Sequence, residues 1–360
     1  MFQIHYMYIV FALFLFLTCF LKNTKAKAAL TVISFVLIFV CSEIGADYGG
    51  YKYIYENCSD PNVHGETLYL LICKMFLSLH CSYELFRVIF LTSFLILFVI
   101  GVYGLSDDFS MSFLFCFLTY LIYLISAYRQ FATISIFVFS LYLLLRKTNA
   151  VVPIILNFLA IFIHKLAVLQ LFVILIIIFY KSFKPRSKFD ISPLKLNLHF
   201  LIISGCLVVR LGLYFLLNVG SVQAFLSSFD YTSNVTMINN GLLSRLTMLV
   251  LILIVADYKQ IDENTSLLLF IYYFAILLYC AVPFELIMGR LVNNFRILEI
   301  IIIPNLMFSK NKKPFKLKRE RYFSEACKLM MICVACTVFI VQLVTQIGYV
   351  PFVNYFVGGI

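Results

Sequence analysis

The stretch FRVIFLTSFLILFVIGVYGL, from Phe86 to Leu105, carries a single charged side chain, Arg87. A helix of about 20 apolar residues crosses the hydrocarbon core of a bilayer and satisfies its own backbone hydrogen bonds there. The stretch therefore predicts a membrane-spanning helix.

Similar apolar runs recur along most of the chain. They are Tyr6–Leu21, Ala28–Ile44, Met111–Ser126, Phe131–Leu145, Val151–Ile163, Leu166–Tyr180, Leu198–Leu217, Leu242–Ala256, Ser266–Val282, Leu291–Phe308 and Ala326–Ile347. Together they predict an all-α, polytopic integral membrane protein with about 12 transmembrane helices. We expect one transmembrane domain over residues 1–360, with outer loops at about 45–83 and 218–241. The run Thr67–Leu79 is short and contains Lys74, so we expect it to lie in the membrane interface.

The composition supports a lipid environment. Apolar residues make up 63% of the chain and charged residues 12%, and the mean hydropathy is +1.01. Water-soluble domains carry about 25% charged residues. The net charge of +11 does not indicate nucleic-acid binding, because the basic residues cluster in short blocks between apolar runs. Such blocks are orientation signals.

Assigning alternate loops to alternate sides puts 19 of the 28 basic residues on one side, which is then cytoplasmic. This arrangement predicts a multi-pass protein of a bacterial inner membrane with both termini periplasmic. The other nine basic residues fall on the outer side or in the membrane, where a functional role is the default hypothesis. They are Lys52, Lys74, Arg87, Arg129, Lys165, Arg210, Arg245, Arg290 and Arg296. Snorkelling to headgroups or local pairing is the alternative.

Candidate site residues gather on the predicted outer side. They are Asp47, Tyr48, Tyr51, Glu66, Arg129, Gln130, His164, Lys165, Arg245, Arg290 and Arg296. Arginine suits a phosphate ligand because its planar fork donates two hydrogen bonds and stays charged. A carboxylate or His164 could take a proton from an attacking hydroxyl.

Each of these residues also has a structural interpretation. His164 could end a helix and bond a backbone carbonyl, and Asp47 could cap the turn that follows it. The tyrosines from Tyr48 onward could form an interfacial aromatic belt. Cys58, Cys73 and Cys81 could form a disulfide in an oxidising compartment. No metal-ligand spacing, Walker sequence or G-x-G-x-x-G motif is present, so we expect no metal and no cofactor.

Several motifs resemble those of the EpsG-like and Wzy-type O-antigen (polysaccharide) polymerases. The segment YRQFATISIFVFSLYLLLRKTNAVVPIILNFLAIFIHKLAVL, Tyr128 to Leu169, resembles their central signature, with Arg-Gln opening one span and His ending the next. GADYGGY, Gly45 to Tyr51, resembles an outer-loop motif, and Gly289–Arg290 a late arginine. Tyr349–Val350–Pro351–Phe352 resembles a terminal aromatic-proline segment. Lys165 departs from the family, which has a small hydroxyl residue after the histidine.

The resemblance implies a metal-independent glycosyltransferase, similar to the membrane-embedded GT-C-type enzymes. It would transfer a growing glycan from undecaprenyl pyrophosphate onto a lipid-linked repeat unit at the periplasmic face. Arg129 and Arg290 would hold the pyrophosphate, and His164 or Asp47 would serve the acceptor hydroxyl. The sugar site would be lined by Tyr51, Gln130 and Glu66, while Tyr48, Lys165, Arg245 and Arg296 would bind substrate. The expected partners are the undecaprenyl-pyrophosphate-linked oligosaccharide and membrane lipid, with a flippase and a chain-length regulator of the same pathway.

Two rival functions stay open. A flippase for lipid-linked oligosaccharides would need cationic residues along a path open to both sides, whereas here they concentrate at one side. A membrane O-acyltransferase receives its donor from the cytoplasm, and the cytoplasmic loops here carry only orientation signals.

Overall fold

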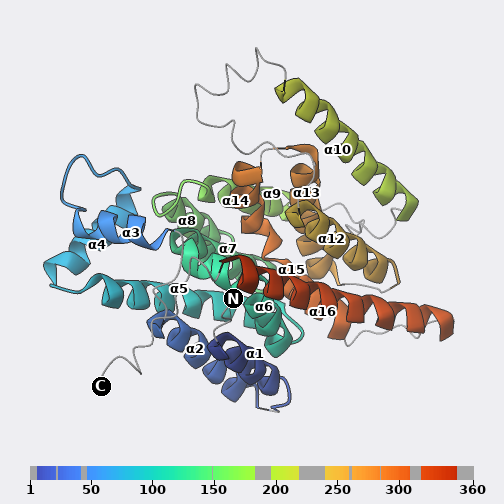
Figure 1. The fold of residues 1–360 in the computed structure, drawn as a ribbon, viewed down its shortest axis with the longest axis horizontal. Helices are drawn as coiled ribbons and strands as arrows, with labels where there is room; N and C mark the ends of the chain where they lie inside the picture. Colours follow the sequence, from blue (N-terminus) through green and yellow to red (C-terminus); the bar gives the residue numbers. More distant parts are fainter. Residues whose placement is uncertain are drawn as a thin grey trace. The chain divides into compact units, whose positions relative to one another are not determined.

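The computed structural model describes residues 6–21, 23–41, 47–147, 149–182, 196–218, 240–258, 262–283, 285–308 and 318–346. Within these ranges every regular element is an α-helix, which confirms the prediction of an all-α protein (Figure 1). The helices are α1 Tyr6–Thr18, α2 Thr24–Cys41, α3 Tyr48–Glu56, α4 Thr67–Ser78, α5 Tyr83–Leu105, α6 Phe109–Ser126, α7 Tyr128–Arg146, α8 Val151–Ile161, α9 Ala167–Ser182, α10 Leu196–Leu217, α12 Asn240–Tyr258, α13 Glu263–Ala281, α14 Glu285–Arg296, α15 Glu299–Phe308 and α16 Lys318–Gln346.

The chain divides into two compact units. Unit 1 comprises Met1–Lys184 and Cys336–Ile360, and unit 2 comprises Pro185–Ala335. Each unit is described by itself below. This division into compact units does not test the prediction of a single transmembrane domain over residues 1–360, which stays a prediction. The terminal Tyr349–Phe352 motif and most of the predicted outer loop 218–241 lie outside the described residues.

The apolar helices are those of a membrane protein. In the part of the chain that the structure describes, four segments are long and apolar enough to cross a bilayer: Tyr83–Leu105, Tyr128–Arg146, Leu198–Leu217 and Glu263–Ala281. Shorter apolar helices are Thr67–Ser78, Phe109–Leu121, Val151–Ile161, Ala167–Ser182 and Leu242–Ala256. The count of twelve spans stays a prediction.

The prediction of one helix over Leu291–Phe308 is wrong. This stretch belongs to two helices, α14 and α15, which a tight turn at residues 297–298 separates. The turn uses i→i+3 bonds, including Leu298 N–H to Phe295 O at 3.1 Å. Pro304 inside α15 further weakens a continuous helix, because it has no N–H to donate.

Helix α7 forms the centre of unit 1. It packs against α5, α6, α8 and α9 (Figure 1). The backbones of α5 and α7 come close together at Gly101 of α5, where an added Cβ would lie 2.9 Å from the backbone nitrogen of Phe139 in α7. A glycine at this position lets the two backbones meet, as small residues do between membrane helices.

Basic side chains stabilise the carboxyl ends of three helices. Arg87 donates to Phe39 O of α2 at 2.7 Å, and Lys181 donates to Leu144 O of α7 at 2.9 Å. In unit 2, buried Arg210 of α10 donates to Tyr279 O at 3.0 Å and Val282 O at 2.9 Å, where α13 ends. A cation there pairs with orphan carbonyls and the negative end of the helix dipole. Arg87 and Arg210, two of the nine singled-out basic residues, thus have structural roles.

The predicted outer loop 45–83 is largely helical. Helix α3 was not predicted, because Gly49 and Gly50 occupy its first turn and glycine disfavours helix. Burial of Tyr51 and Tyr55 stabilises it nonetheless. Helix α4 lies in the run expected to be interfacial and ends in a Schellman motif, with His80 at a φ of 55° and Cys81 N–H bonded to Phe76 O at 3.1 Å.

Candidate functional site

The amino end of α4 docks on the turn between α8 and α9 in unit 1. The carbonyl of Phe162 accepts hydrogen bonds from the backbone N–H groups of Leu68 at 3.0 Å and Tyr69 at 3.2 Å. These are orphan donors of the first helical turn, which a side chain usually caps. Glu66 sits at the N-cap position but makes no side-chain cap bond. Its carboxylate is therefore available to other partners.

The Glu66 carboxylate joins three segments of unit 1. Oε2 pairs with Nη1 of Arg129, from the first turn of α7. Oε1 lies 3.3 Å from Nδ1 of His164 and 3.5 Å from the backbone N–H of Lys165, both in the α8–α9 turn. The side chains of Glu66, Arg129 and His164 are each 17–18% exposed. The structure thus brings three predicted site residues into one sheltered cluster.

Aromatic rings hold the Arg129 guanidinium in place. Its Cζ lies 4.8 Å from the ring centroid of Tyr51 and 5.1 Å from that of Tyr69. The hydroxyl of Tyr69 is hydrogen-bonded to that of Tyr128, so the ring of Tyr69 is itself fixed. Such cation–π contacts strengthen as the cation loses water. The rings and the carboxylate together fix the direction of the guanidinium fork.

Charge and burial act in opposite directions on Glu66. Burial raises the pKa of its carboxyl, but the hydrogen bond with His164 and the charge of Arg129 outweigh this and hold the pKa at about 2. The carboxylate is therefore ionised at neutral pH and can only accept hydrogen bonds. For a bond to form, Nδ1 of His164 must carry a proton, which leaves Nε2 of the neutral ring as a base.

The structural alternative for His164 is not what the structure shows. Nδ1 faces a carboxylate rather than a backbone carbonyl. Asp47 precedes α3, yet its side chain makes no cap bond and is not among the partners described for Glu66, Arg129 or His164. A base role for Asp47 gains no support from this geometry.

The other predicted site residues of unit 1 differ in whether they contact the cluster. Tyr51 is buried beside Arg129, and Gln130 is buried one position further along α7. Lys165 contributes its backbone N–H, and its side chain is exposed. The hydroxyl of Tyr48 lies 3.3 Å from Glu84 instead.

The remaining predicted arginines belong to unit 2. Arg245 of α12 stacks on Tyr279, with Cζ 3.9 Å from the ring centroid, and its Nη2 lies 3.5 Å from Asn293 Oδ1. Arg296 of α14 pairs with buried Glu299 at 3.3 Å, and Tyr272 donates to the same carboxylate at 3.2 Å. The side chain of Arg290 is exposed on α14.

Three groups that hold the Glu66–Arg129–His164 cluster in place were not predicted from the sequence: Tyr69, Tyr128 and the Phe162 carbonyl. Tyr128 directly precedes Arg129, and Tyr69 follows Glu66 by three residues, so neighbourhood to charged candidates was the available signal. Nothing in the sequence marks Phe162, because its contribution is a backbone carbonyl.

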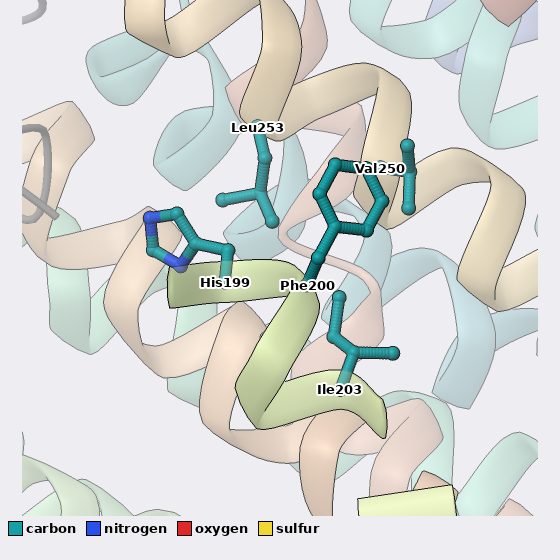
Figure 2. Close-up of a pocket in the computed structure, with 5 residues that line it drawn as sticks. All are labelled: His199, Phe200, Ile203, Val250 and Leu253. Carbon is teal, nitrogen blue, oxygen red and sulfur yellow. The ribbon is translucent and has the colours of Figure 1, made fainter. Parts of the chain in front are cut away.

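A recess in unit 2 is not a ligand site. Figure 2 shows it between α10 and α12, lined by His199, Phe200, Ile203, Val250 and Leu253. It has no room for a water molecule. Nδ1 of His199 lies 3.2 Å from the hydroxyl of Tyr273, a bond that satisfies a buried ring.

Comparisons with known proteins identify a family. The model of the EpsG family matches residues 31–357, which is well over half of the chain. No curated protein and no solved structure matches. The match begins within α2 and covers α3 to α16, and thus the whole Glu66–Arg129–His164 cluster. The chain belongs to the EpsG family.

Proposed function

We propose that this protein is a polysaccharide (O-antigen) polymerase of the bacterial inner membrane. It transfers a growing glycan from undecaprenyl pyrophosphate onto a lipid-linked repeat unit at the periplasmic face. Membership of the EpsG family supports a polysaccharide polymerase-like role. The observation that supports the chemistry is the pairing of one carboxylate, Glu66, with both an arginine and a histidine.

His164 is the general base in this proposal. With Nδ1–H donating to Glu66, Nε2 accepts the proton of the acceptor sugar hydroxyl. The hydroxyl oxygen then bonds to the anomeric carbon of the donor as the bond from that carbon to the pyrophosphate oxygen breaks. Glu66 orients the ring and stabilises the imidazolium that forms, as a carboxylate does in a catalytic triad.

Arg129 of unit 1 binds the pyrophosphate in this proposal, while a phosphate-binding role for Arg290 of unit 2 stays an expectation from the family resemblance. The leaving group departs with its electron pair as an anion, so it needs positive charge rather than an acid. Arg245 and Arg296 add positive charge within unit 2. Tyr51 and Gln130 line the sugar site, with the lipid-linked oligosaccharide as substrate and no metal.

Complementation of a gene deletion tests the proposal. Plasmids carry wild type, Arg129→Ala, Arg290→Ala, His164→Gln or the control Glu84→Gln, and the glycan ladder is read on a gel after equal membrane expression is verified. We expect Arg129→Ala, Arg290→Ala and His164→Gln to leave single repeat units. The Glu84→Gln control should give the full ladder. The Glu84 pair with Lys52 is exposed and lies outside the cluster, so it makes a matched control.

Three results would contradict the proposal. A full ladder in the deletion strain would contradict the polymerase function. Accumulation of unflipped repeat units would favour a flippase. A full ladder with His164→Gln would contradict the role of His164 as general base.

A further inference from the structure

The Arg129 fork already holds an anion in the absence of substrate. Glu66 pairs with Nη1, and the Tyr51 and Tyr69 rings lie against the guanidinium. Nε is buried and has no hydrogen-bond partner. Since 17% of the side chain is exposed, solvent still reaches part of this fork. A substrate phosphate that binds Arg129 must therefore meet the Glu66 carboxylate.

A phosphate and a carboxylate compete for such a fork. Both anions can accept two parallel N–H bonds from the planar fork of a guanidinium. One guanidinium charge cannot neutralise both anions, and the two repel each other at contact distance. Binding of one on Arg129 thus weakens binding of the other.

Glu66 keeps other partners if it leaves Arg129. Oε1, the oxygen that does not contact Arg129, already lies 3.3 Å from His164 Nδ1 and 3.5 Å from the backbone nitrogen of Lys165. Phe162 still holds the amino end of α4 through two backbone bonds. A small rotation of the Glu66 side chain is therefore enough, and the helix need not move.

We propose that a substrate phosphate replaces Glu66 on Arg129, after which Glu66 serves His164 alone. This inference rests on the proposed function and makes Glu66 a positioning residue instead of a sugar ligand. A carboxylate that is not shared with Arg129 stabilises a protonated imidazole more than a carboxylate whose charge Arg129 partly neutralises. Binding of the donor pyrophosphate thus frees Glu66 to stabilise the imidazolium that His164 forms when it takes the proton.

The sign of an affinity change tests the replacement. The full chain is placed in phosphatidylcholine nanodiscs, and inorganic pyrophosphate binding is measured by titration calorimetry. Glu66→Gln removes the competing charge, so we expect binding about tenfold tighter than wild type. Glu66→Asp keeps the charge on a shorter arm, so its affinity should lie between the two. Glu84→Gln should bind as wild type, and Arg129→Gln should not bind.

Two outcomes overturn the inference. Weaker or unchanged binding by both Glu66 variants would mean that Glu66 supports Arg129 instead of competing for it. If Glu66→Gln fails to fold, the affinity of Glu66→Asp decides between these alternatives. Absence of pyrophosphate binding in wild type and both variants would also overturn the inference, while the glycan ladder tests the polymerase separately.

Membrane phospholipid is the other source of phosphate. Nanodiscs that include phosphatidylglycerol test this source against pyrophosphate. Unchanged pyrophosphate affinity supports pyrophosphate as the ligand of Arg129. A pyrophosphate affinity that falls as phosphatidylglycerol increases assigns the fork to a lipid headgroup and overturns the inference.

Discussion

Substitution of Glu66 by Gln should destabilise the protein by far more than the same change at Glu84. The folded-state pKa of Glu66 is about 2 against an ordinary value of 4.5. Each unit of difference is about 1.4 kcal/mol, so the charged carboxylate contributes on the order of 3 kcal/mol at neutral pH. The Glu84–Lys52 pair is 39–41% exposed, and exposed pairs contribute about 0.2–1 kcal/mol.

Reactivity of a buried thiol reports unfolding in this protein, which has no tryptophan. Cys116 of α6 is fully buried, so in a background in which the other cysteines, such as exposed Cys333, are replaced, a fluorogenic maleimide reacts only when the fold opens. We expect Glu66→Gln to lower the free energy of unfolding by on the order of 3 kcal/mol, and Glu84→Gln by less than about 1 kcal/mol. Equal losses in the two variants would refute the assignment of Glu66 as a sheltered ion-pair partner.

The pH dependence has a definite sign. Because folding lowers the pKa of Glu66, its contribution is complete above pH 4.5 and is lost as the pH falls toward 2. The stability difference between wild type and Glu66→Gln should therefore shrink as the pH falls below 4.5. A difference that grows below pH 4.5 would contradict the ion pair.

Four further changes test the fold. Gly101→Ala should cost about 1–3 kcal/mol, because its Cβ would lie 2.9 Å from backbone in α7. Gly205→Ala in α10 has open space and should be neutral or slightly stabilising in the same thiol assay. His80→Gly should stabilise the protein by about 1 kcal/mol, since His80 has a φ of 55°; a loss would refute the strain. Arg210→Met should cost about 2 kcal/mol, because it leaves two carbonyls at the end of α13 without a donor; unchanged stability would refute its capping role.

Apolar periodicity predicts the helices well where burial in lipid and in protein require the same pattern. The runs at α5, α7 and α10 match within a few residues. The pattern fails at α14 and α15, because a mostly apolar stretch conceals a turn and a proline. It also fails at α3, where tertiary burial of tyrosines overrides the low helix propensity of two glycines.

The site illustrates a different limit. Glu66, Arg129 and His164 could each be named from the sequence by residue type and position. Their connection could not, because Glu66 lies 63 residues from Arg129 and 98 from His164. The interpretation of Glu66 therefore changed from a sugar ligand to the partner of both. Only the packing of α4 on the α8–α9 turn reveals that role.

The partners of a buried arginine distinguish structural from functional use. Arg87 and Arg210 donate to backbone carbonyls at helix ends, and a ligand that displaced those carbonyls would leave them without donors. All three arginines lie over tyrosine rings, but Arg129 pairs with a side-chain carboxylate. A phosphate can replace a carboxylate on a guanidinium without disturbing any helix, since both accept the same fork of donors. An arginine paired with a side-chain carboxylate at a helix start is thus suited to exchange its anion, and this property favours Arg129 over Arg87 and Arg210 as the proposed phosphate ligand.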